Sequence, residues 1–166
     1  MEIDDGYSLK LELAEYKGLG DTSSIQIVDE KGDPIYSLFD HVTVKPTKMG
    51  AWQLYLLNIS SHVLPAYWHG IYQSRTYIFK ESYIDELYPI KFHDLSELIE
   101  TDQLLPSVTI VNKDASGCTM IVKCCYWNAW EGLVRERARI VLEKGRCISF
   151  KKSKETLFAY NCGIIL

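Results

Sequence analysis

The last third of the sequence contains five runs rich in β-branched and aromatic residues, separated by short polar turns. These runs are 107–111, 119–126, 133–142, 146–150 and 156–160. Strands that follow one another with short turns pair antiparallel. The pattern therefore predicts a C-terminal antiparallel meander. A fold of the α+β class dominated by strands follows from it.

The N-terminal third also has the periodicity of strands. Residues 7–14 alternate apolar and polar side chains, which is typical of a strand with one solvent-exposed face. Runs 24–28 and 35–39 flank a polar segment that contains Gly32 and Pro34, two turn residues. We therefore expect the two runs to form a hairpin.

The middle of the chain supplies the helices. Residues 47–64 lie between Pro46 and Pro65 and fit a helix or a strand, and their length favours the helix. Its expected apolar stripe consists of Trp52, Tyr55, Leu56, Ile59 and Val63. A helical turn near 82–86 and a short helix between Asp94 and Pro106 are further candidates. We expect one to three short helices within a single domain that spans residues 1–166.

The sequence argues against a membrane-spanning or secreted protein. The chain of 166 residues has no apolar run of the roughly 18 residues that a membrane-spanning helix needs. Its first residues, Met-Glu-Ile-Asp-Asp, have neither the basic nor the apolar part of a signal peptide. We therefore expect a cytoplasmic protein that does not engage a membrane.

Charge is distributed unevenly along the chain. Residues 1–112 hold 8 Lys or Arg and 17 Asp or Glu, whereas residues 113–166 hold 10 basic and 5 acidic residues. Such asymmetry indicates a charged partner, unless the two parts interleave in space and their charges cancel. The net charge of −4 disfavours nucleic acid as that partner.

The sequence contains no recognisable catalytic or metal-binding motif. Its five cysteines, an odd number without Cys-x-x-C spacing, indicate reduced thiols. The four histidines are scattered, and phosphate-binding loops and Gly-x-Ser-x-Gly are absent. We expect no catalytic residue, no cofactor and no metal. An enzyme that uses Cys124 or Cys125 with one histidine stays open as the alternative.

Residues 67–92 form an aromatic segment, with eight Tyr, Trp or Phe among 26 residues. These side chains fit a hydrophobic core, and equally a protein-binding surface, because aromatic residues among carboxylates dominate interface hot spots. On the second interpretation the candidate partner-binding residues are Trp68, Tyr72, Tyr77, Glu81, Tyr83, Asp85 and Glu86.

A row of arginines, Arg135, Arg137 and Arg139, would project from one face of the run 133–142. The row fits a solvated outer face paired with carboxylates, or a surface that grips phosphate or carboxylate groups. Val134, Ala138 and other apolar residues alternate with the arginines, and Glu136 is the exception in that apolar row. A small-ligand or nucleic-acid module built on this row is a further alternative.

The stretch from Cys125 through Trp127 and Glu131 to Gly132, followed by a hairpin, resembles a Cys-x-Trp-x-x-Glu-His-Gly-like signature. This signature occurs in small uncharacterised bacterial β-rich domains, some of which are similar to immunity proteins of polymorphic toxin systems. The chain departs from it by lacking the histidine before Gly132 and by one additional residue after Trp127. No catalytic residue carries over from the resemblance.

These observations together predict a non-enzymatic protein-binding domain. Its acidic first two-thirds would attract a basic protein, and the resemblance implies an immunity-type inhibitor of a basic toxin. Whether the domain forms a homo-oligomer is left open by the sequence.

Overall fold

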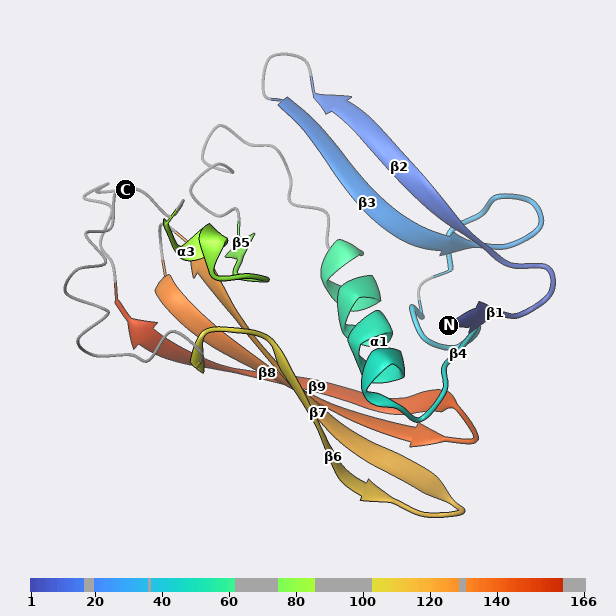
Figure 1. Ribbon diagram of the computed structural model, residues 1–166. Helices are drawn as coiled ribbons and strands as arrows, with labels where there is room; N and C mark the ends of the chain where they lie inside the picture. The colour runs from blue at the N-terminus through green and yellow to red at the C-terminus, as the bar shows by residue number, and fades with distance from the viewer. Residues whose placement is uncertain (17–19, 36, 62–74, 86–102, 129–130, 160–166) are drawn as a thin grey trace. The chain divides into compact units, whose positions relative to one another are not determined.

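The computed structural model describes residues 1–16, 20–35, 37–61, 75–85, 103–128 and 131–159 (Figure 1). Strands dominate these residues, and they pair antiparallel wherever the register is defined. The strands are β1 (Glu2–Ile3), β2 (Ser8–Tyr16), β3 (Gly20–Val28), β4 (Val42–Thr43), β5 (Thr76–Tyr77), β6 (Ser107–Lys113), β7 (Gly117–Asn128), β8 (Gly132–Glu143) and β9 (Arg146–Phe158). The helices are α1 (Lys48–Ser60) and α3 (Ser82–Asp85). The expected strand-dominated class is confirmed.

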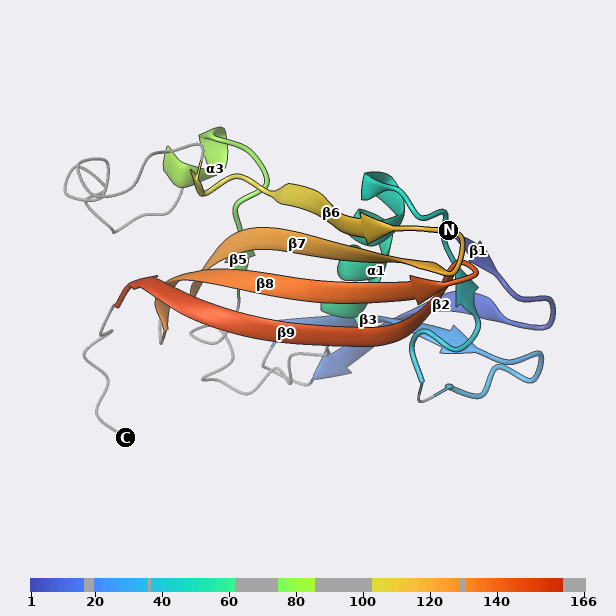
Figure 2. The same ribbon diagram turned by 90° about the horizontal axis from the view of Figure 1, so that it is seen from below.

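The larger sheet has the strand order β1-β4-β9-β8-β7-β5, and β6 also pairs with β7. Figure 2 shows β6, β7, β8 and β9 side by side in chain order, as a meander requires. One run differs from expectation, because β9 continues from Arg146 to Phe158 where the sequence predicts two separate strands. Its polar middle is largely exposed, so the strand continues there without apolar side chains.

The predicted hairpin between residues 24–28 and 35–39 is wrong. The turn itself forms, since the Asp29 carboxylate accepts hydrogen bonds from the backbone N–H groups of Lys31 and Asp33. Only a single bridge between Val28 and Pro34 follows it. Backbone hydrogen bonds from the Asp29 N–H to the Asp33 carbonyl oxygen and from the Ile35 N–H to the Ile27 carbonyl oxygen flank this bridge, so Pro34 lies where the ladder needs no N–H. Residues 38–40 then form a turn and not a strand, and β3 pairs with β2 along its whole length.

The described residues fall into two compact units. Unit 1 comprises 1–71, 108–122 and 138–151, and unit 2 comprises 72–107, 123–137 and 152–166. Unit 1 holds the β2–β3 hairpin and α1, and unit 2 holds β5 and α3. Each unit contains a part of β7, β8 and β9.

In unit 1, α1 confirms the helix predicted for residues 47–64. Thr47 caps it, because its hydroxyl accepts a hydrogen bond from the Gly50 N–H at 3.2 Å. Its buried face differs from the expected stripe: Ala51, Leu54 and Tyr55 are fully buried, whereas Trp52 is half-buried. The segment is apolar around most of its circumference, so periodicity alone did not define the buried side.

Among the described residues, no helix is long and apolar enough to cross a membrane. The helical turn expected near 82–86 is present as α3. The short helix expected between Asp94 and Pro106 falls largely outside the described residues. Within residues 71–80 the structure contains β5, and residues 71–74 lie outside the described part of the chain.

A substitution at Gly50 tests the contact between α1 and the chain that precedes it. A Cβ atom there would overlap the Lys45 carbonyl oxygen, a backbone atom that cannot move freely. We expect Gly50→Ala to lower the free energy of unfolding by about 1–3 kcal/mol, as overpacking does, although alanine is the better helix former. Urea denaturation measures the change. Met49→Ala, at an exposed neighbour, should stay within about 0.5 kcal/mol of the wild type. Equal stabilities of the two variants would contradict the close contact.

Candidate functional site

Unit 2 buries a carboxylate on the inner face of β8. Along this strand Val134, Ala138 and Ile140 point to one side and are buried. Glu136 lies in the same row, and its side chain is 0% exposed. A buried charge is costly unless it is paired. The side chains around Glu136 must therefore include cations or hydrogen-bond donors, which an apolar core residue does not need.

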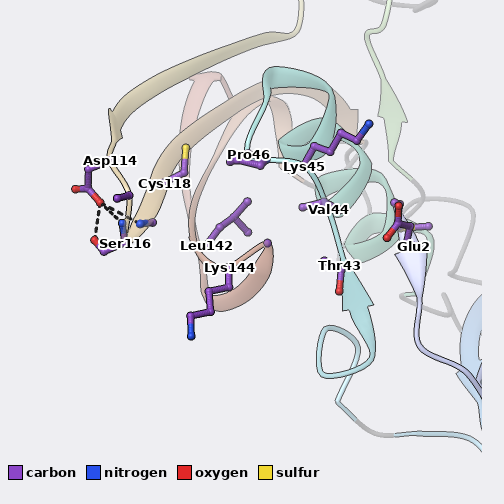
Figure 3. A pocket seen from close by; sticks show the side chains of 14 residues that line it. Glu2, Thr43, Val44, Lys45, Pro46, Asp114, Ser116, Cys118, Leu142 and Lys144 are labelled. Carbon is purple, nitrogen blue, oxygen red and sulfur yellow. Dashed lines mark hydrogen bonds between the residues drawn. The ribbon is translucent and has the colours of Figure 1, made fainter.

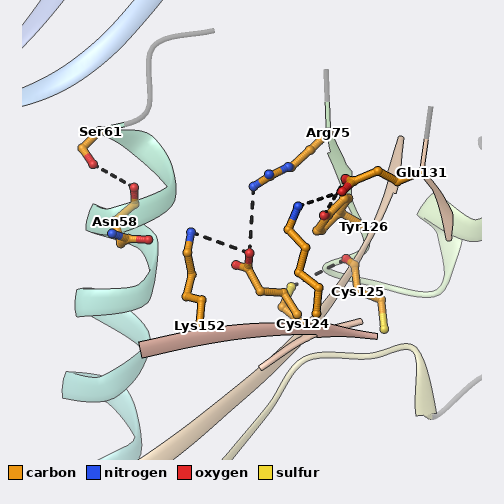
Figure 4. Close-up of polar contacts among 10 residues, drawn as sticks. Asn58, Ser61, Arg75, Cys124, Cys125, Tyr126, Glu131 and Lys152 are labelled. Atoms are coloured by element: carbon orange, nitrogen blue, oxygen red, sulfur yellow. Dashed lines mark hydrogen bonds and ion pairs between the residues drawn. The ribbon is translucent and has the colours of Figure 1, made fainter. Parts of the chain in front are cut away.

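Two cations flank this carboxylate. The Arg75 Nη1 and Lys152 Nζ atoms lie 3.9 and 3.6 Å from the Glu136 Oε2 atom, and Figure 4 shows both side chains directed toward it. Arg75 immediately precedes β5, and Lys152 belongs to β9. About a quarter of each cationic side chain is exposed. The burial of Glu136 thus ties Arg75, which is remote in sequence, and the neighbouring strand β9 to β8.

A second polar group lies beside the first (Figure 4). The Tyr126 hydroxyl donates a hydrogen bond of 2.8 Å to Glu131, and Lys154 donates another of 2.8 Å to the other oxygen of the same carboxylate. The Asn128 side chain accepts a hydrogen bond from the Glu131 N–H at 3.1 Å, which holds Glu131 at the start of β8. Three cations and two carboxylates therefore meet on one side of unit 2.

Protonation states in this cluster are fixed near neutral pH. Burial, and then the hydrogen bond to Glu131, raise the pKa of Tyr126 well above its ordinary value. Burial also raises the pKa of Tyr77, against the effect of its hydrogen bond with Arg75. Burial by itself would raise the pKa of Glu131, but the hydrogen bonds from Lys154 and Tyr126 lower it by more. The pKa of Glu131 therefore lies below its ordinary value. The phenols stay protonated and the Glu131 carboxylate stays ionised.

The charged cluster supports an aromatic stack, which we define as Tyr126, Tyr77 and Phe79. The Arg75 guanidinium lies 4.7 Å from the centre of the Tyr126 ring. The Tyr77 ring lies 5.5 Å from Tyr126 and 5.7 Å from Phe79, nearly parallel to the latter. Tyr126 is fully buried, whereas 41% of Phe79 is exposed. The stack therefore leads from the core of unit 2 to its surface.

The structure describes four of the seven residues that the sequence nominates for partner binding. Tyr77 is half-buried within the stack, Glu81 is exposed, and Tyr83 is partly exposed with the Lys80 ammonium 4.6 Å from its ring centre. Asp85 ends α3. Trp68, Tyr72 and Glu86 lie outside the described residues.

Sequence reasoning missed Arg75 and Phe79 as members of this site. Arg75 is isolated in sequence, and nothing near it indicates a buried partner. The available signal was Glu136, a carboxylate in an otherwise apolar row, which demands a cation from elsewhere in the fold. Phe79 belonged to the aromatic segment, but composition could not show which of its rings are exposed.

The arginine row faces away from the buried carboxylate. Arg135 is half-buried and forms an ion pair of 3.3 Å with Glu155, while Arg137 and Arg139 are exposed. Arg135 and Arg137 line a small cavity of about 230 Å³ in unit 2, together with Lys123, Ser153, Lys154 and Glu155. Arg139 belongs to unit 1. The expected pairing with a carboxylate on an adjacent strand is present for Arg135.

Unit 1 contains a larger cavity of about 460 Å³ (Figure 3). Val44, Pro46 and Leu142 are among the residues that line it, as is Asp114. The Asp114 carboxylate accepts hydrogen bonds from the backbone N–H groups of Ser116 and Gly117 at 2.8 and 3.0 Å. These contacts lower the pKa of Asp114, and the hydrogen bonds from Ser116 have a larger effect than the one from Gly117. Asp114 is thus engaged in closing the β6–β7 turn.

Of the described thiols, Cys118, Cys124 and Cys125 are buried and Cys147 is half-buried. Burial raises the pKa of Cys118 and Cys125, and it raises the pKa of Cys147 to about 11. All four described cysteines are free thiols. The described histidine, His41, stacks on Tyr7 with ring centres 3.6 Å apart. The other three histidines lie outside the described residues. In the described part of the chain, no three His, Cys, Asp or Glu side chains are grouped to hold a metal ion.

No protein family, no curated protein and no solved structure matches this chain. The resemblance to immunity-type domains therefore stays a prediction.

Removing the buried carboxylate tests the role of Glu136. We expect Glu136→Gln to lower the free energy of unfolding toward the lower end of the roughly 3–5 kcal/mol seen when one partner of a buried ion pair is lost. The lower end applies because Arg75 and Lys152 keep some contact with solvent. Urea denaturation measures the change. The matched control is Glu155→Gln, whose carboxylate is 64% exposed and whose loss should cost less than about 1 kcal/mol. Equal effects would contradict the special role of Glu136.

Glu131 makes the stability of unit 2 depend on pH. Because its pKa in the folded chain lies below the ordinary 4.5, its carboxylate stabilises the fold above pH 4.5. That contribution disappears as the pH falls through the lowered pKa. We expect Glu131→Gln to cost about 1 kcal/mol at pH 7, and the difference from the wild type to vanish in acid. Denaturant titrations at several pH values measure it. A difference that persists in acid would show that packing, and not charge, is responsible; Glu143→Gln, at an exposed site, is the control.

Proposed function

We propose that this chain is a non-enzymatic domain that binds another protein, and that residues 75–85 of unit 2 form part of the binding surface. The observation that carries the proposal is the aromatic stack, in which an exposed ring is supported by a charged cluster around the buried Glu136. Rigid aromatic side chains bind partners at a low cost in conformational entropy. Phe79 has this character, since it stacks on Tyr77 and is 41% exposed.

Charge near the stack favours a basic partner. Glu81 is exposed two residues after Phe79, and the sequence adds Asp85 and Glu86 close behind. Carboxylates at the rim of an interface speed association with a basic protein more than they strengthen the complex. A basic toxin bound by an immunity-type inhibitor would be a partner of this kind, in keeping with the resemblance of residues 125–132.

The direction of the pKa shifts favours binding over acid–base catalysis. Catalytic acids and bases have pKa values moved toward neutrality. In the described residues with a resolved shift, the carboxyl pKa values of Asp4, Asp114 and Glu131 move down. The thiol and phenol pKa values move up. Each of these groups is therefore held in one protonation state near pH 7.

A photo-crosslinking amino acid at position 79 tests the proposal in extract of the native cell. We expect one protein to be cross-linked from position 79 and not from position 148 of β9, which is also exposed, at 54%. With that partner purified, Phe79→Ala should weaken binding about 30-fold, which corresponds to the loss of a hot spot of about 2 kcal/mol.

Charge reversal then separates long-range electrostatic attraction, which sets the association rate, from direct contact in the complex. Replacing Glu81, Asp85 and Glu86 by lysine should slow association at low salt and leave the melting temperature unchanged. Glu143→Lys, at an exposed position of unit 1, is the matched control. Cross-linking that is equal at positions 79 and 148, or association unchanged by charge reversal, would refute this placement of the surface.

A further inference from the structure

Strand β6 is an edge strand. It pairs with β7, and no strand in the described part of the chain pairs with its other side (Figure 2). Six of its seven residues are exposed, including Ile110 at 37% and Val111 at 57%. Its outer backbone N–H and C=O groups are therefore a template for a further strand.

The composition of β6 favours such pairing. Residues 108–111 are Val, Thr, Ile and Val, which are all β-branched and have high β propensity. The only charged residue of the strand is Lys113 at its end, and its ammonium donates a hydrogen bond of 3.1 Å to the Pro46 carbonyl oxygen. No charge or proline along residues 107–112 interrupts the edge.

Strand β9 shows how this sheet protects an edge. β4 pairs with β9 only at Thr43 and Arg146, so the rest of that side has no partner strand among the described residues. β9 carries Lys151, Lys152 and Lys154 along this stretch. Lysine on an edge strand opposes pairing with another chain. The same protection is missing from β6.

We propose that β6 pairs antiparallel with β6 of a second copy of this chain, so that the two large sheets continue into one. The strand is self-complementary about Ile110: Thr109 would face Val111 of the other copy, and Ser107 would face Lys113. No like charges oppose each other in this register. β-branched pairs across strands stabilise such a contact. This dimer is independent of the binding surface at residues 75–85.

The test is analytical ultracentrifugation of the full chain over a wide range of concentration, with hydrogen exchange of the β6 amides. We expect a concentration-dependent species of twice the chain mass. The β6 amides that point away from β7 should become protected as the dimer forms. A protein that stays monomeric into the high micromolar range, or a dimer without protection of β6, overturns the proposal.

Two variants localise the contact. Ile110→Lys places two ammonium groups next to each other across the symmetry axis and should raise the dimer dissociation constant by at least about ten-fold. Ile148→Lys makes the same change on β9, at a side chain that is 54% exposed, and should leave the dissociation constant unchanged. Val111→Lys replaces Ile110→Lys if circular dichroism shows that the latter is unfolded. An equal effect of the β6 and β9 variants, or no effect of the β6 variant, overturns the proposal.

Discussion

The organisation of unit 2 depends on compensation of the buried Glu136 carboxylate. Because a buried carboxylate is costly without cations nearby, Arg75 and Lys152 must both approach β8. This requirement fixes the position of the chain before β5 and the direction in which Lys152 of β9 points. Arg75 also lies over the Tyr126 ring. A single charged residue in β8 thus determines where the aromatic stack begins.

The same charged cluster also contacts the aromatic residues of unit 2. Lys152 and Lys154 point to Glu136 and Glu131, so their charges stabilise the interior of unit 2. Tyr126 donates a hydrogen bond to Glu131, carries Arg75 over its ring, and contacts Tyr77 and through it Phe79. A ring fixed in this way loses little freedom on binding, which is the physical basis of the proposed protein-binding surface.

The two long edges of the sheet have different chemistry, and the difference indicates different roles. Lys152 and Lys154 of β9 pair with the buried Glu136 and the partly exposed Glu131, and these lysines also discourage pairing along that edge. β6 has a β-branched, uncharged centre. Protection of one edge and not the other is consistent with a sheet that accepts a further strand on one side only, and the proposed dimer uses that side.

The sequence by itself determined the parts of the fold that local pattern controls. Runs of β-branched and aromatic residues predicted β7 and β8, short polar turns predicted the meander, and length with the flanking prolines favoured the helix α1. It also marked Glu136 as the exception in an apolar row. It failed at residues 35–39, which look like a strand in sequence: the chain forms a turn at residues 38–40, and β3 pairs with β2.

The site itself was decided by tertiary structure. Alternation shows that Glu136 is buried, but only the folded chain shows that Arg75 and Lys152 compensate it, because such pairing joins residues that no local rule connects. The aromatic content of residues 67–92 was visible in the sequence. Which ring is buried, as Tyr126 is, and which is exposed, as Phe79 is, depends on the neighbours that each ring meets in three dimensions.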